Sequence, residues 1–111
     1  MNDEAAFSNL VALAQRSRWD IFTLLIAEEP QGLAAGDIGS RLGIPPATLS
    51  FHLKELSQAG LLQPSREGRQ IIYMPNFAGI DAFLDFLEQK CRHRSPQSSA
   101  EEPDAVGQLR H

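Results

Sequence analysis

Cysteine and long apolar segments are scarce in this chain of 111 residues. The one cysteine, Cys91, cannot form a disulfide within the chain, which argues against a disulfide-stabilised secreted scaffold. No apolar run approaches the roughly 18 residues that a membrane-spanning helix requires. The first seven residues, MNDEAAF, are acidic and lack the basic and apolar regions of a signal peptide. We therefore expect a single globular domain in the cytoplasm.

The chain also lacks a net positive charge, with ten Lys and Arg against fourteen Asp and Glu and a formal net charge of −4. This total counts against a nucleic-acid partner, because basic stripes are the usual electrostatic footprint of one. The distribution is less unfavourable than the total. Residues 36–73 carry four basic and three acidic side chains and are net positive, so the acidic excess lies in the rest of the chain. A DNA-facing surface on an acidic body is compatible with this pattern.

Apolar periodicity and turn chemistry predict a mainly α fold with one small β-hairpin. Asn2 and Asn76 are expected to cap the first and last helices, and Ser17 the second. Helices are predicted over residues 3–15, 18–28, 34–42, 46–59 and 77–91, and strands over 61–65 and 70–74. From residue 94 the composition becomes polar and predicts a disordered tail. The expected domain is thus residues 1–93, followed by a tail over 94–111.

The segment from Asp37 to Leu56 is the most informative. Two short helices joined by a tight turn at Gly43 predict a helix-turn-helix. At about 100° per residue, the leucines of the second helix fall on one side and are expected to face the core. Its other side combines small residues, a hydroxyl, a ring and one cation: Ala47, Ser50, Phe51, Lys54 and Gln58. Such a face can enter a major groove, because small residues permit close approach and hydroxyls can bond base edges or phosphates.

The hairpin extends this prediction. Arg66 and Arg69 flank its expected tip, from which a wing could reach phosphates or the minor groove. Phosphate contacts position a protein, whereas base contacts specify sequence. We assign Arg66 and Arg69 to affinity, and the helix from Pro46 to Lys54 to specificity. The alternative is a winged helix that contacts another protein, with the two arginines merely solvated.

Apolar side chains on the last helix form a stripe that is too wide for a single contact. Its members are Phe77, Ile80, Leu84, Leu87 and Cys91, widened by Phe83 and Phe86. Part of this stripe is expected to pack on its own domain and part on a second copy of the chain. The first helix offers a matching surface through Phe7, Leu10 and Val11. The pattern therefore favours a homodimer.

Three motifs in the same order resemble the ArsR/SmtB family of bacterial repressors, which respond to metals and metalloids. Residues 13–25 are similar to the LA-x-x-TR-x-x-IL-x-LL helix, residues 48–62 to the T-V-S-x-H-L-x-x-L…AGL recognition helix, and Glu67-Gly68-Arg69 with Ile72-Tyr73 to the wing. The resemblance implies a winged helix-turn-helix homodimer built from the first and last helices. It also implies two recognition helices in successive major grooves of a palindromic operator, and release of the DNA when an effector binds.

The resemblance carries DNA contact by residue type to Thr48, Ser50 and His52. Phe51 stands where the family commonly has arginine, and two prolines stand where Ser-Gln is common. With the residues argued above, the expected DNA-contact set is Pro46, Ala47, Thr48, Ser50, Phe51, His52, Lys54, Arg66 and Arg69. For His52, a structural role is an equal alternative.

Cys91 and His93 are the candidate effector residues. Relatives that sense arsenic use about three thiolates, and one protomer here supplies one. The zinc pattern of relatives is not reproduced either, because His93 follows the acidic residues of the last helix instead of lying among them. Three interpretations stay open: Cys91 as a buried apolar residue of the dimer stripe, sensing with the partner's thiol by oxidation or by metal bridging with His93, or an effector site without a thiol.

No cofactor is required by this sequence, and we do not expect an enzyme. A nucleophilic Cys91 would need a base and an oxyanion site. Arg92 and His93, at a helix end beside the tail, provide no fixed geometry for either.

Overall fold

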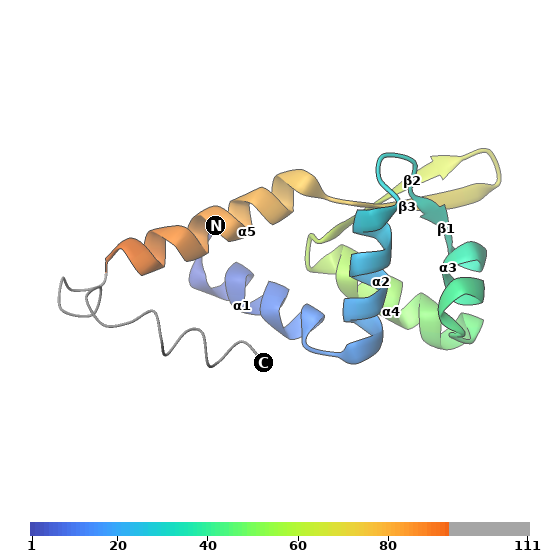
Figure 1. Cartoon of the computed structure of the whole chain (residues 1–111), viewed down its shortest axis with the longest axis horizontal. Coiled ribbons are helices and arrows are strands. Elements are labelled where there is room, and N and C mark those ends of the chain that lie inside the picture. Colours follow the sequence, from blue (N-terminus) through green and yellow to red (C-terminus); the bar gives the residue numbers. More distant parts are fainter. Residues whose placement is uncertain (94–111) are drawn as a thin grey trace.

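The computed structural model describes residues 1–93, and the predicted tail lies outside the described residues. The elements are α1 (Asp3–Leu13), α2 (Arg16–Ala27), β1 (Leu33–Ala34), α3 (Ala35–Leu42), α4 (Pro46–Gln58), β2 (Leu62–Glu67), β3 (Gln70–Pro75) and α5 (Phe77–Arg92). Figure 1 shows α2, α3, α4 and the sheet gathered at one end, with α1 and α5 extending away together. The predicted mainly helical winged fold is confirmed.

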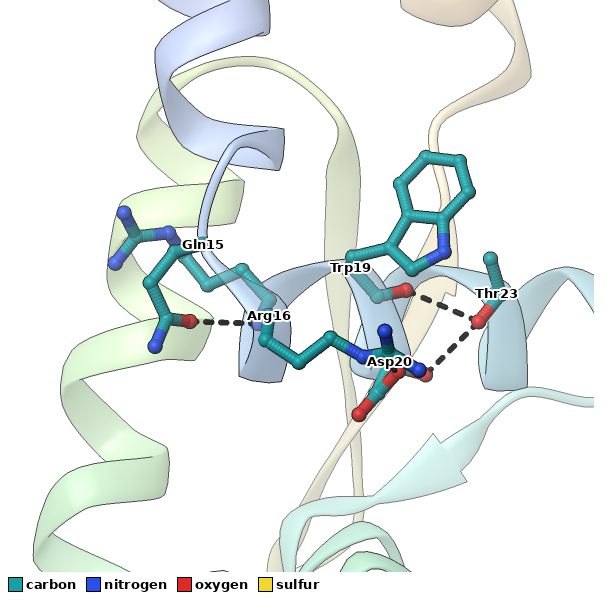
Figure 2. Close-up of polar contacts among 6 residues, drawn as sticks. Gln15, Arg16, Trp19, Asp20 and Thr23 are labelled. Carbon is teal, nitrogen blue, oxygen red and sulfur yellow. Dashed lines mark hydrogen bonds and ion pairs between the residues drawn. The ribbon is translucent and has the colours of Figure 1, made fainter. Parts of the chain in front are cut away.

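Side-chain caps set the helix boundaries. Asn2 Oδ1 accepts the amide of Ala5 at 2.8 Å, and Asn76 Oδ1 accepts that of Gly79 at 3.3 Å, so both predicted caps are confirmed. The predicted Ser17 cap is wrong. Gln15 Oε1 accepts the amide three residues on at 2.9 Å, and α2 therefore begins at Arg16 (Figure 2).

The sheet has one strand more than the sequence predicted. Leu33 pairs with Tyr73, and Ala34 with Ile72, so β1 joins the hairpin in an antiparallel sheet of order β1-β3-β2. The hairpin is also longer than predicted, because β2 and β3 stay paired as far as Glu67 and Gln70. Its turn is only Gly68 and Arg69, and Gly68 adopts a φ of 65°. Arg66 consequently lies on the strand and Arg69 in the turn.

The core lies between α2, α3, α4 and the sheet. Its fully buried side chains are Ile21, Leu25, Ile38, Leu53, Leu56 and Leu61. Helix α2, which contributes Ile21 and Leu25, is thus central to the fold. Trp19 on the same helix is 46% exposed, and its ring centroid lies 6.4 Å from that of Phe22.

The start of α5 is fastened to the turn between α4 and β2. Asn76 Nδ2 donates to the carbonyl of Gly60 at 3.0 Å, and the Asn76 amide donates to that of Leu61 at 2.9 Å. A Cβ at Gly79 would collide with the same Gly60 carbonyl, so only glycine permits this approach. The direction in which α5 leaves the body is thereby fixed. Within residues 1–93, no helix has the length and apolar character needed to cross a membrane.

Candidate nucleic-acid interface

Helix α4 has two chemically distinct sides. Leu49, Leu53 and Leu56 are buried, as their spacing predicts. The opposite side is open to solvent and carries Pro46, Ala47, Thr48, Ser50, Phe51, Lys54 and Gln58. Phe51, the one aromatic ring on this side, is 55% exposed. The exposed side of α4 is therefore accessible to the major groove of DNA.

The surface beside α4 is hollowed and built of small residues. A hollow of about 330 Å³ lies between α3 and α4, with Gly36, Gly39 and Ser40 on one wall and Pro46 and Ser50 on the other. Neither α3 nor α4 has a side-chain cap at its N-terminus. Their first-turn amides are consequently available to an anion, and helix N-termini favour phosphate.

The basic side chains of residues 1–93 fall into two groups, those with a partner in the protein and those without one. Four form ion pairs with carboxylates at 2.8–3.3 Å, namely Arg16, Arg41, Lys90 and Arg92. Arg18 is held by hydrogen bonds. In this part of the chain only Lys54, Arg66 and Arg69 have no carboxylate or hydrogen-bond partner. These three lie on α4 and on the wing, so the cations left for an external anion are those of the predicted DNA surface.

His52 does not lie on that surface. It is 7% exposed, because it follows Leu49 by three residues and precedes Leu56 by four and so shares their side of α4. Its Nδ1 is 3.3 Å from Arg18 Nη1, and Arg18 Nε donates to the carbonyl of Ala12 at 2.7 Å. The prediction that His52 contacts DNA is therefore wrong, because its side chain lies inside the domain.

Burial is the main cause that lowers the pKa of His52 below its ordinary 6.5. The guanidinium of Arg18 lowers the pKa further, while Glu55 acts in the opposite direction. Sequence patterns did not single out Arg18, because its contact with His52 joins residues 34 positions apart. The only signal was its place in the helix motif of residues 13–25.

An apolar face remains open on α1 and α5, which lie side by side in Figure 1. Its exposed members are Phe7, Leu10, Val11, Phe77, Leu84 and Leu87, with Phe7 at 68% and Leu84 at 56%. Ile80 differs from the other predicted interface residues, because it is half-buried and packs on the core. Phe83 is buried in the same chain. The stripe on α5 is thus divided between its own domain and open solvent, as its width predicted.

The predicted effector residues are at the far end of α5. Cys91 and His93 are both exposed. Over residues 1–93, no cluster of three or more His, Cys, Asp or Glu side chains could hold a metal ion. Residues 1–93 of the chain therefore do not bury Cys91.

Comparison with known proteins agrees with this geometry. Residues 13–64 match a family described as a helix-turn-helix domain. The transcriptional activator HlyU of Vibrio cholerae is 28% identical over 88 residues, which are 79% of each chain. Its structure has a TM-score of 0.63 at 27% identity, covering 80% of this chain and 96% of that one.

An ArsR-like transcriptional regulator from Rhodococcus sp. RHA1 has a TM-score of 0.72 at 26% identity, covering 80% of this chain and 81% of that one. A homodimeric winged helix-turn-helix DNA-binding domain from Mycobacterium bovis shares the fold, with a TM-score of 0.64 at 23% identity over 84% and 90% of the chains. These relatives are transcriptional regulators rather than enzymes. The chain is a DNA-binding transcriptional regulator whose winged helix-turn-helix is similar to that of the ArsR-like regulators.

Proposed function

We propose that this protein is a homodimeric repressor. Helix α4 recognises the bases of a palindromic operator, and the wing contacts the flanking phosphates. The observation that carries the proposal is where the cations without a protein partner lie. Within residues 1–93 these cations are Lys54, on the exposed side of α4, and Arg66 and Arg69, on the wing. Phosphate supplies the missing counter-charge for these cations.

The proposed roles follow from side-chain chemistry. Thr48 and Ser50 can donate to or accept from base edges, and Phe51 can contact a thymine methyl group. Lys54 is one turn beyond Ser50 on the exposed side and can reach a base or a phosphate. Arg69, in a two-residue turn, suits a phosphate contact, which gives affinity without sequence information.

A second copy of the chain completes the proposed DNA-binding unit. The apolar face of α1 and α5 is the surface that we assign to the dimer contact, because folded monomers rarely leave such patches uncovered. The homodimeric Mycobacterium bovis domain of the same fold supports the assignment. A two-fold pair presents two α4 helices to half-sites about one helical turn apart, which requires a palindrome.

Repression by occupancy is the proposed mode of action. A homodimer that occupies its operator excludes other proteins from the same DNA, which is sufficient for repression. Activation is the second candidate, because the relative from Vibrio cholerae is a transcriptional activator. A reporter driven by the bound promoter separates the two: deletion of the gene raises its output for a repressor and lowers it for an activator. Either mode would act in the cytoplasm.

We further propose that an effector releases the DNA. Cys91 with the partner's thiol, helped by His93, is the candidate sensor of a metal, metalloid or oxidant. No cofactor is needed for DNA binding itself.

The test of the DNA surface is a double substitution, Ser50→Ala with Lys54→Ala. We expect it to abolish binding to a duplex that the wild-type protein enriches from a random pool, while the dimer persists in analytical ultracentrifugation. The matched control removes a hydroxyl and a cation from the exposed face of α2, through Thr23→Ala with Arg16→Ala (Figure 2). Unchanged affinity of the Ser50 and Lys54 variant would remove α4 from the reading role.

A further inference from the structure

Arg18 joins three helices at a single point. Its backbone amide donates to the side chain of Gln15 at 2.9 Å, at the start of α2. Its Nε donates to the carbonyl of Ala12 on α1 at 2.7 Å, and its Nη1 is 3.3 Å from Nδ1 of His52 on α4. Ala12 directly follows Val11 of the apolar face, and His52 directly follows Phe51 of the DNA surface. The guanidinium therefore lies between the proposed dimer contact and the proposed reading helix.

This contact is possible only for one form of the imidazole. A guanidinium has donors and no acceptor, so Nδ1 of His52 must accept, which places the one ring proton of neutral His52 on Nε2. Protonation of His52 would turn Nδ1 into a donor and bring two positive charges together at 3.3 Å. The hydrogen bond would then be replaced by repulsion between two partly buried charges.

The ring of His52 is also in contact with the DNA surface. Its centroid is 5.8 Å from that of the exposed Phe51 ring, with an interplanar angle of 59°. A displacement of His52 would consequently move Phe51 and turn the exposed side of α4.

We propose that Arg18 and His52 form a latch that positions α4 for DNA binding and that holds only while His52 is neutral. The inference rests on the proposed function, since it concerns how the reading helix is held. Arg18 is a positioning residue in this scheme and does not itself touch DNA.

The sign of the pH dependence follows from the charges around His52. The groups that act on it are Arg18 on α2, which opposes protonation, and Glu55 on α4, which favours it. Burial and Arg18 prevail, so the pKa of His52 lies below 6.5 in the folded protein. The stabilisation by the latch is complete above pH 6.5 and is lost as the pH falls through the lowered pKa.

The test measures DNA affinity between pH 7.5 and pH 5.5 at fixed salt. The probe is a duplex of about 30 base pairs, long enough for two half-sites, enriched from a random pool by the wild-type protein. We expect wild-type affinity to fall severalfold on acidification and by no more than about tenfold, because a pKa below 6.5 leaves about a tenth or more of His52 neutral at pH 5.5. Protonation of other groups makes the protein more positive and acts in the opposite direction.

Two variants make the test specific. His52→Gln keeps an oxygen acceptor for Arg18 but cannot titrate, so its affinity should be within about threefold of wild type at pH 7.5 and should not fall on acidification. Arg18→Ala should weaken binding by about tenfold at pH 7.5 and remove the dependence on acid. Arg16→Ala, which loses only an exposed ion pair with Asp20 at 3.1 Å, is the matched control and should behave as wild type.

Two further results would overturn the latch. One is an acid-induced loss of affinity that persists in His52→Gln. The other is an NMR spectrum of wild-type His52 at pH 7.5 with the ring proton on Nδ1, a measurement that needs neither DNA nor a variant. Failure to enrich any duplex would instead refute the proposed function, which keeps the two failures distinguishable.

Discussion

The clearest quantitative prediction concerns the salt dependence of Arg69→Ala. Arg69 lies in the two-residue turn of the wing and has no carboxylate partner in the described part of the chain. If it contacts a phosphate, its removal prevents the release of the counterions bound there. Each phosphate contact contributes about 0.9 to the slope of log affinity against log salt. A dimer loses two contacts, so the slope should decrease in magnitude by about 1.8.

This change is large enough to measure. Between about 50 and 200 mM salt, a slope difference of 1.8 changes the relative affinity of variant and wild type by about twelvefold. Fluorescence anisotropy of a labelled duplex across this range gives the slope directly. The loss should be similar for all sequences, because a phosphate contact carries no base information.

The matched control is again Arg16→Ala, which removes the same charge from a position already paired with Asp20. Its slope should equal that of wild type, since an exposed charge farther from the duplex than the Debye length of about 8 Å is screened. Equal changes in slope for Arg16→Ala and Arg69→Ala would mean that total charge, and not a wing contact, sets the affinity. A changed sequence preference in Arg69→Ala would place this side chain among the base-reading residues.

Three other substitutions test the remaining parts of the structure. Leu84→Glu should dissociate the dimer in analytical ultracentrifugation and leave a folded monomer, because Leu84 is 56% exposed within one chain; a persistent dimer would place the contact elsewhere. Asn9→Ala should lower the free energy of unfolding by about 1–3 kcal/mol in urea titrations, since buried Asn9 donates to the carbonyl of Ala59 at 2.7 Å; no loss would show that this bond contributes little. Cys91→Ser should no longer release DNA on addition of arsenite, zinc, cadmium or peroxide if Cys91 senses the signal, and an unchanged response would assign the residue a structural role.

The faces of the helices could be predicted from sequence because helical periodicity is local. The leucines of α4 and the exposed residues between them lie where a rotation of about 100° per residue puts them. The strand β1 could not be predicted, because two residues carry no alternation and the partner strand β3 is some forty residues away in the chain. Gln15 was missed as a cap because glutamine is not among the residues favoured there.

Which charged side chains form ion pairs was the other feature that could not be predicted from the sequence. Arg41 and Arg66 look equivalent in the sequence, yet Arg41 is held by Glu28 at 2.9 Å and Arg66 has no such partner in residues 1–93. The spacing of His52 puts it on the leucine side of α4, but its partner Arg18 lies on another helix and could not be identified from that spacing. Such contacts join residues 13 and 34 positions apart, so only the folded chain reveals them.

The most direct test of the proposed reading surface is amide chemical-shift mapping of the ¹⁵N-labelled protein during titration with the enriched duplex. The largest changes should fall on residues 46–54 of α4 and 66–70 of the wing, with the outer half of α5 unaffected. Chemical-shift changes confined to α1 and α5, with none in α4 or the wing, would contradict the account.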